Sequence, residues 1–131
     1  MRYLVDTSTL VRMVRRQVDP KWAEPAGRGL IAICDPVLVE TLTIADAKAY
    51  DRAERGLRDV YPWVTVPKDA WQMVRAVRQE LATHSAHEGL SVADHLVIAT
   101  AIRLKLVVLH QDADFETAAR FVPQLGQERI A

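Results

Sequence analysis

The sequence predicts an α/β domain built on a mainly parallel central sheet of about four to five strands, with helices on both faces. Short apolar runs of the kind that form buried strands alternate along the chain with longer segments of helical spacing. The 131 residues, 50% of them hydrophobic and 26% charged, suit one domain over residues 1–131. No internal repeat, low-complexity tract or linker divides it.

The expected strands are apolar runs that end at a turn or an acid, as strands covered on both faces do. They are residues 3–5, 30–34, 63–66, 106–109 and, as a last edge strand, 127–130.

Helical spacing predicts the helices between these strands. We expect them at 10–16, 22–28, 35–44, 46–61, from 67 onward, 91–104 and 115–121. The helix that begins at 67 should place Ala70, Val74, Val77 and Leu81 on one face. Asp35 is expected to cap the third of them with Pro36 at the first helical position, and Ser91 to cap the sixth.

Composition excludes several classes of protein. Lys plus Arg equals Asp plus Glu at 17 each, so net charge neither demands nor excludes a nucleic-acid partner. Cys34 is the only cysteine, which argues against a disulfide framework or a Cys-rich zinc site and fits a reducing cytoplasm. No apolar run is long enough to span a membrane, and Asp6 and Arg12 interrupt any signal-peptide core. We therefore expect a cytoplasmic protein with no membrane partner.

Two acids follow apolar strands at the point where each strand ends. Asp6 comes directly after Tyr3–Val5, and Asp112 follows the run that ends at Leu109. In open α/β sheets ligands bind beyond the carboxyl ends of the strands, so carboxylates placed there suit chemistry. The alternative is that each Asp only caps the helix that follows it.

Two further acids lie on helices. Glu40 is the lone charge in an otherwise apolar helix, where it needs a partner or a solvated cleft. A turn of 100° per residue places Asp94 on the apolar side of its helix, opposite His95, Thr100 and Arg103. The alternatives are a surface Glu on a wet helix face and an Asp that reinforces a helix start.

Four carboxylates in one crevice would repel one another unless a cation lay between them. Oxygen ligands favour hard divalent ions such as Mg²⁺ or Mn²⁺, and Mg²⁺ held by carboxylates usually acts on phosphate. Asp114, two residues after Asp112, is either a further ligand or the cap of the last helix.

These motifs resemble those of the PIN-domain ribonucleases, and most closely the VapC toxins of bacterial toxin–antitoxin pairs. The matching stretches are Asp6-Thr-Ser8, Pro-Val-Leu-Val-Glu40, Ser91-Val-Ala-Asp94-His-Leu-Val-Ile-Ala and Val108-Leu-His-Gln-Asp112-Ala-Asp114-Phe115. They occur in family order, at family-like spacing and over essentially the whole chain. Each motif is weak by itself, whereas the ordered set is specific.

The resemblance implies a role for each acid. The catalytic quartet that binds Mg²⁺ or Mn²⁺ would be Asp6, Glu40, Asp94 and Asp112. Asp114 would be an additional, fifth acid. Ser8 would be the small polar residue that supports Asp6. His110 occupies a position that often holds Thr or Ser, and no catalytic role follows for it.

The resemblance also implies an activity and partners. The activity would be hydrolysis of tRNA, rRNA or mRNA by in-line attack, which leaves a 5′-phosphate. One partner would be a VapB-type antitoxin, which inserts a basic side chain near the acids while apolar helix faces form the rest of the contact. The other partner would be a second copy of this chain in a homodimer. The setting would be the bacterial cytoplasm.

Several basic and aromatic residues have two interpretations each. Arg12, Arg15 and Arg16 follow the first acid-bearing turn and either hold RNA phosphates or form a solvated face. A second basic group, more typical of a wet helix face, is Lys48, Arg52, Arg55 and Arg58. Trp22, Trp63 and Trp71 suit the core better than base stacking. His84, His87 and His95 are expected in loops or on the surface.

Four other classes of protein fit the sequence less well. A receiver-like phosphoacceptor domain needs an acid pair after the first strand and a late lysine, but Thr7 and Ser8 follow Asp6 and no lysine follows Lys105. A haloacid-dehalogenase-type phosphatase needs a second Asp at position 8. A non-catalytic nucleic-acid or protein-binding module on the same fold would be favoured by a missing acid, yet all four are present. Nucleotide-cofactor enzymes would need a Gly-rich phosphate loop, which is absent.

Overall fold

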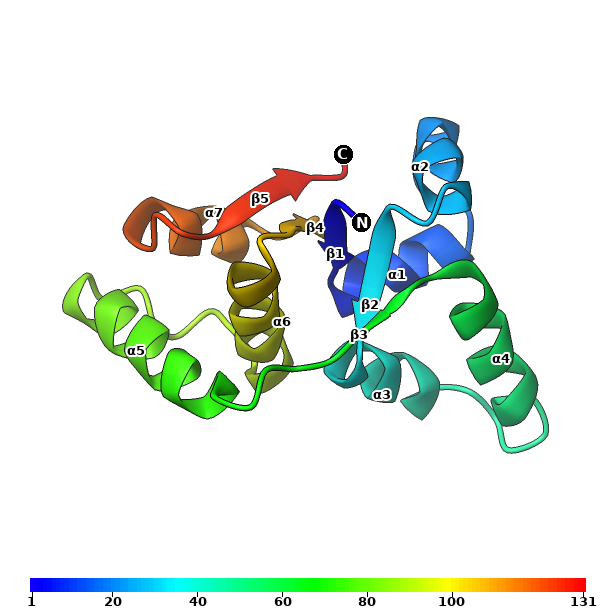
Figure 1. Cartoon of the computed structure of the whole chain (residues 1–131), viewed down its shortest axis with the longest axis horizontal. Helices are drawn as coiled ribbons and strands as arrows, with labels where there is room; N and C mark the ends of the chain where they lie inside the picture. The colour runs from blue at the N-terminus through cyan, green and yellow to red at the C-terminus, as the bar shows by residue number, and fades with distance from the viewer.

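The computed structural model describes residues 1–131 and contains one five-stranded sheet in which every neighbouring pair is parallel. The strand order is β3-β2-β1-β4-β5 (Figure 1). The strands are β1 (Tyr3–Val5), β2 (Ile31–Cys34), β3 (Trp63–Val64), β4 (Val107–His110) and β5 (Gly126–Arg129). The predicted α/β fold class is confirmed.

Seven α-helices and one short 3₁₀ helix connect the strands. They are α1 (Thr7–Val14), the 3₁₀ helix η1 (Pro20–Trp22), α2 (Ala23–Gly27), α3 (Asp35–Thr43), α4 (Tyr50–Val60), α5 (Ala70–Thr83), α6 (Val92–Leu104) and α7 (Ala113–Phe121). None of them combines the length and the apolar character that a membrane span requires.

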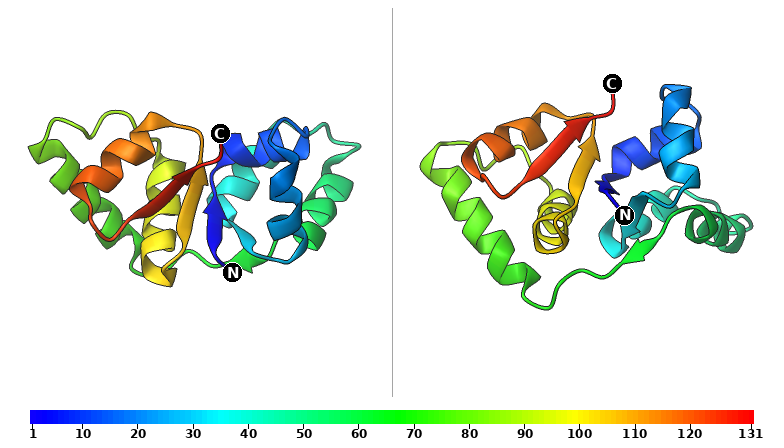
Figure 2. Two further views of the ribbon diagram at one scale, coloured as in Figure 1. Left: turned by 90° about the horizontal axis from the view of Figure 1, so that it is seen from above. Right: turned by 45° about the horizontal axis from the view of Figure 1, so that its top comes forward.

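The order of the strands creates a switch point beside β1. The chain moves outward from β1 through β2 to β3, then returns across the sheet to β4 and moves outward again to β5. Helices α1 to α4 therefore gather on one side of the molecule and α5 to α7 on the other, as Figures 1 and 2 show. A ligand crevice is expected where the connections diverge, beyond the carboxyl ends of β1 and β4.

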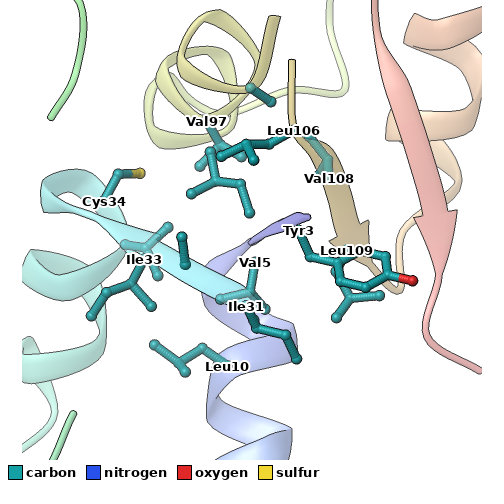
Figure 3. Close-up of a cluster of buried hydrophobic side chains, with 14 of the residues drawn as sticks. Tyr3, Val5, Leu10, Ile31, Ile33, Cys34, Val97, Leu106, Val108 and Leu109 are labelled. Carbon is teal, nitrogen blue, oxygen red and sulfur yellow. The ribbon is translucent and has the colours of Figure 1, made fainter. Parts of the chain in front are cut away.

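The core lies on both faces of the central strands. Leu4, Val5, Val108 and the whole of β2 are inaccessible to solvent, as expected for a sheet covered on both faces. In the close-up of Figure 3, Val97 of α6 and Leu10 of α1 lie on opposite sides of these strands. Helix α6, which carries Asp94, and helix α1, which Asp6 caps, thus both pack on the central strands.

The start of α3 differs from its prediction. Cys34, in an extended conformation, occupies the N-cap position without a side-chain hydrogen bond, and Asp35 is the first helical residue rather than the cap. Pro36 keeps its place in the first turn, where its missing N–H costs nothing. The fourth helix also begins later than predicted, at Tyr50, because Asp46 closes a separate turn by accepting the backbone N–H of Ala49.

The amphipathic prediction for α5 is confirmed. Ala70, Val74, Val77 and Leu81 are all buried along one face of the helix. The prediction for Trp71 is wrong, since this residue is 55% exposed.

Candidate active site

Asp6 is both a helix cap and the most deeply buried acid of the site. Its Oδ1 accepts the N–H of Thr9 at 3.0 Å and its Oδ2 accepts the hydroxyl of Ser8 at 3.3 Å. The side chain is only 4% exposed. Burial raises the pKa of Asp6, and the hydrogen bonds from Thr9 and Ser8 act in the opposite direction. Capping therefore does not exclude Asp6 from the site, and Ser8 supports it as expected.

Asp94 lies in the first turn of α6 in a reciprocal capping box. Its Oδ2 accepts the N–H of Ser91 at 3.1 Å, while the Ser91 hydroxyl accepts the N–H of Asp94 at 3.0 Å. Burial raises the pKa of Asp94, and the negative charges of Asp6 and Asp112 raise it further. The three carboxylates therefore lie close enough to repel one another, although they come from three separate elements.

Asp112 caps α7 and so resolves the open question about Asp114. Asp112 Oδ1 accepts the N–H of Asp114 at 2.9 Å, and the helix begins at the residue between them. Asp114 is therefore not the cap, which corrects that alternative. Burial raises the pKa of Asp114, and the charges of Asp112 and Asp94 raise it further. Asp114 is a fourth carboxylate within the same electrostatic cluster.

Glu40 reaches the site through a different contact. Its side chain is exposed on α3, and its Oε1 accepts the hydroxyl of Thr7 at 2.5 Å. Because Thr7 directly follows Asp6, the hydrogen bond fastens α3 to the carboxyl end of β1. The Thr7 hydroxyl is thus the partner of this lone charge within the chain.

The donor set fits a hard divalent ion. All the clustered groups are carboxylates, and no nitrogen or sulfur ligand accompanies them. Asp94 Oδ1, Asp112 Oδ2 and both oxygens of Asp114 accept no protein hydrogen bond. As the side chains stand, no three His, Cys, Asp or Glu residues lie close enough together to hold one ion.

Gly89 offers a way to test whether Asp114 is a ligand. A Cβ at this position would lie 2.4 Å from Asp114 Oδ1, so Gly89→Ala must displace that carboxylate. If Asp114 binds metal, the substitution should weaken Mn²⁺ binding by roughly tenfold, measured by electron paramagnetic resonance of free Mn²⁺.

The matched control for this substitution is Gly27→Ala, whose Cβ would meet nothing within 4 Å. It should bind Mn²⁺ like the parent protein. Unchanged Mn²⁺ affinity in Gly89→Ala would remove Asp114 from the ligand set.

The remaining candidates are distributed over the surface and the core. Arg12, Arg15 and Arg16 are exposed on and just after α1, the helix that Asp6 caps. The second basic group on and before α4 is also exposed: Lys48, Arg52, Arg55 and Arg58.

The aromatic and histidine predictions are partly confirmed. Trp22 is buried as expected, and Trp63 is partly buried. His84 and His87 are exposed as expected, but the prediction for His95 is wrong, because it is buried in α6. This burial lowers the pKa of the His95 imidazole.

Thr100 is buried as well, whereas Arg103, on the same side of α6, is exposed. Helix α6 contacts α5 on one side and β1 and β4 on the other, which leaves little of it in solvent.

Two polar residues to which the sequence assigned no role, His110 and Gln127, form hydrogen bonds beside the turn that carries Asp112. His110 is fully buried, with its Nδ1 3.0 Å from the Asp112 backbone nitrogen and its Nε2 2.7 Å from Gln127 Oε1. Only the position of His110 at the end of a continuous apolar run could have indicated a buried, partnered imidazole. The contact with Gln127 depends on the register of β5 and carries no sequence signal.

Comparison with known proteins identifies the family of this chain. The model of the PIN domain matches residues 3–121. A curated relative, ribonuclease VapC6 of Mycobacterium tuberculosis, is 38% identical over 106 residues, which are 80% of this chain and 84% of that protein. The chain belongs to the PIN-domain family. Within that family it belongs with the VapC proteins.

Solved structures agree on the fold. The DNA-bound VapBC of Salmonella typhimurium gives a TM-score of 0.77 at 16% identity and covers 100% of this chain and 99% of that one. VapBC-1 of nontypeable Haemophilus influenzae gives 0.77 at 14% identity, with 98% of each chain covered. At these identities the likeness establishes the architecture, which is that of a single PIN domain.

Proposed function

We propose that this protein is a ribonuclease toxin of the VapC type that cleaves RNA endonucleolytically with the help of Mg²⁺ or Mn²⁺. The observation that carries the proposal is the position of Asp6, Asp94 and Asp112 beside the carboxyl ends of the central strands, where burial and the charges of Asp6 and Asp112 raise the pKa of Asp94. Curated relatives that share 28–38% of their residues with this chain are named ribonucleases, which supports RNA as the substrate class.

The acids have distinct roles in this proposal. Asp6, Asp94 and Asp112 would hold the ion, Glu40 would complete the quartet from α3, and Asp114 would be an additional ligand. A bound divalent ion supplies hydroxide near neutral pH and offsets charge on the phosphoryl oxygens.

The capping hydrogen bonds would orient the carboxylates, which still have to move closer together to hold one ion. Ser8 and Thr9 fix Asp6, the Ser91 backbone fixes Asp94, and the first turn of α7 fixes Asp112. No histidine is required as a base, and none of the exposed histidines touches the acids.

Substrate binding would use the basic residues nearest the acids. The helix that Asp6 caps carries Arg12 and is followed by Arg15 and Arg16. These side chains would bind phosphates on either side of the scissile bond. The chain carries no net charge, so phosphate binding depends on such local groups.

We propose a VapB-type antitoxin as the partner that controls this activity. An apolar groove of about 550 Å³ runs between α1, α3 and α4, next to the helix segment that carries Glu40. Its apolar lining includes Val11, Val14, Leu42, Ile44, Leu57 and Val60. A groove of this kind suits the apolar face of a partner helix. Homodimer formation stays a prediction.

The test is cleavage of total bacterial RNA by purified, antitoxin-free protein. With Mg²⁺ or Mn²⁺ we expect discrete fragments, whose ends identify the RNA and carry 5′-phosphates. A chelator should abolish the fragments and added metal should restore them. Intact RNA under every condition would favour the non-catalytic binding module instead.

A further inference from the structure

His110 is completely buried at the end of β4, and each of its two ring nitrogens makes a hydrogen bond. Its Nδ1 accepts the backbone N–H of Asp112 at 3.0 Å. A neutral imidazole that accepts at Nδ1 carries its proton on Nε2, which lies 2.7 Å from Gln127 Oε1 and donates to it. The two hydrogen bonds therefore fix one tautomer and one ring orientation.

The ring also has a packed environment. Phe115, the first large core residue of α7, lies with its ring centroid 5.1 Å from that of His110 and is itself fully buried. Gln127 belongs to the edge strand β5, and the backbone of β5 continues the connection because the Ile130 N–H donates to the His110 carbonyl at 2.7 Å. The imidazole thus bridges the edge of the sheet and the turn before α7.

That turn presents Asp112. The N–H of Asp112 is held by His110, and its carboxylate accepts the N–H of Asp114 through Oδ1, which leaves Oδ2 available. We propose that His110, oriented by Gln127, is a positioning residue that fixes the Asp112 carboxylate in the geometry needed to bind the divalent ion. This inference rests on the proposed metal-dependent function.

The bond to the Asp112 N–H does not require a histidine. A Ser, Thr or Asn side chain can accept the N–H two residues ahead and form the same local turn. None of these shorter side chains would fill the space of the imidazole or reach Gln127. This chain therefore makes the same turn with a residue that also connects it to β5.

Two substitutions of nearly equal size separate positioning from packing. His110→Asn keeps an acceptor for the Asp112 N–H, and His110→Leu removes it. Both lose the contact with Gln127 and leave a similar void beside Phe115, so these two losses are common to both variants. Any difference between them reports the bond to Asp112.

We expect His110→Leu to weaken Mn²⁺ binding by about 10–100-fold and to lower kcat while the KM for an RNA oligonucleotide stays unchanged. His110→Asn should restore Mn²⁺ binding to within about threefold of the parent protein. Hydrogen exchange of the Asp112 amide in the metal-free protein should be fast in His110→Leu and protected in His110→Asn. Gln127→Leu, which keeps the His110 ring, should lie between the two and serves if His110→Leu fails to fold.

Equal Mn²⁺ affinities in His110→Leu and His110→Asn would overturn the inference, whether both were weakened or both unchanged. Loss of amide protection with unaltered Mn²⁺ binding would overturn it as well. Failure of the proposed function has a different signature, because the parent protein itself would then neither bind Mn²⁺ nor cleave RNA.

Discussion

Asp94→Asn is expected to lower RNA cleavage by at least about 100-fold and to leave the protein as stable as the parent or more stable. A lost partner around a metal ligand costs 10–100-fold, and loss of the ligand itself should reach at least the upper end of that range. The amide oxygen of Asn can still accept the Ser91 N–H, so the start of α6 should be retained. The measurements are cleavage of RNA under saturating Mg²⁺ and the free energy of unfolding without metal.

The expected gain in stability has an electrostatic origin. The ionised Asp94 is disfavoured by burial and by Asp6 and Asp112, so a neutral side chain relieves the metal-free fold. The matched control is Asp59→Asn, the same chemical change at an exposed position of α4. It should change neither cleavage nor stability. A variant at Asp94 that cleaves RNA normally would refute the proposed site, and one that unfolds would refute the account of its energetics.

The sequence was informative about the acids because their positions follow from local rules. An apolar run that ends in Asp places a carboxylate at the carboxyl end of a strand, and this holds for Asp6 and, two residues beyond its strand, for Asp112. The two interpretations offered for these residues were not exclusive. A cap uses one oxygen and leaves the side chain at the sheet edge, so Asp112 both starts α7 and faces the other acids.

The errors arose where tertiary packing overrides a local pattern. A helical wheel places His95 opposite the apolar side of α6, which predicted a surface position, but α5 packs against α6 and His95 is buried. Asp-Pro predicts a cap followed by the first helical residue, whereas the extended backbone of Cys34 already supplies the cap position and moves Asp35 into the helix. In both cases the residue types are ordinary for the structure that forms, and only the three-dimensional neighbours decide.

The contacts that orient the acids could not be predicted. Thr7 and Glu40 are separated by 33 residues, and the bond between them depends on how α3 packs beside β1. His110 and Gln127 face each other only because β5 pairs with β4 in one particular register. Sequence patterns identify the ligand candidates, and long-range packing determines how rigidly they are held.

Added Mg²⁺ or Mn²⁺ should raise the melting temperature strongly at neutral pH and hardly at all in acid. An ion that binds only the folded state at 100 times its Kd contributes about 2.7 kcal/mol, or roughly 10 °C in a domain of this size. The carboxylates must be ionised to bind it. Because the folded pKa values of Asp6, Asp94 and Asp114 are raised, ion binding should fade as the pH falls through these raised values.

The metal-free protein should show the opposite trend in the same pH range. A raised folded pKa means that the folded state takes up protons before the unfolded state does, so stability increases as the pH falls from neutral toward the ordinary carboxyl range near 4. The Glu116–Arg129 pair acts in the other direction, since it lowers the pKa of Glu116. Subtracting the pH profile of Asp94→Asn removes this and every other distant contribution. The difference in the free energy of unfolding between the two proteins could instead be constant between neutral pH and pH 4. In that case the carboxylates would not repel one another, and a cation would have no such repulsion to offset.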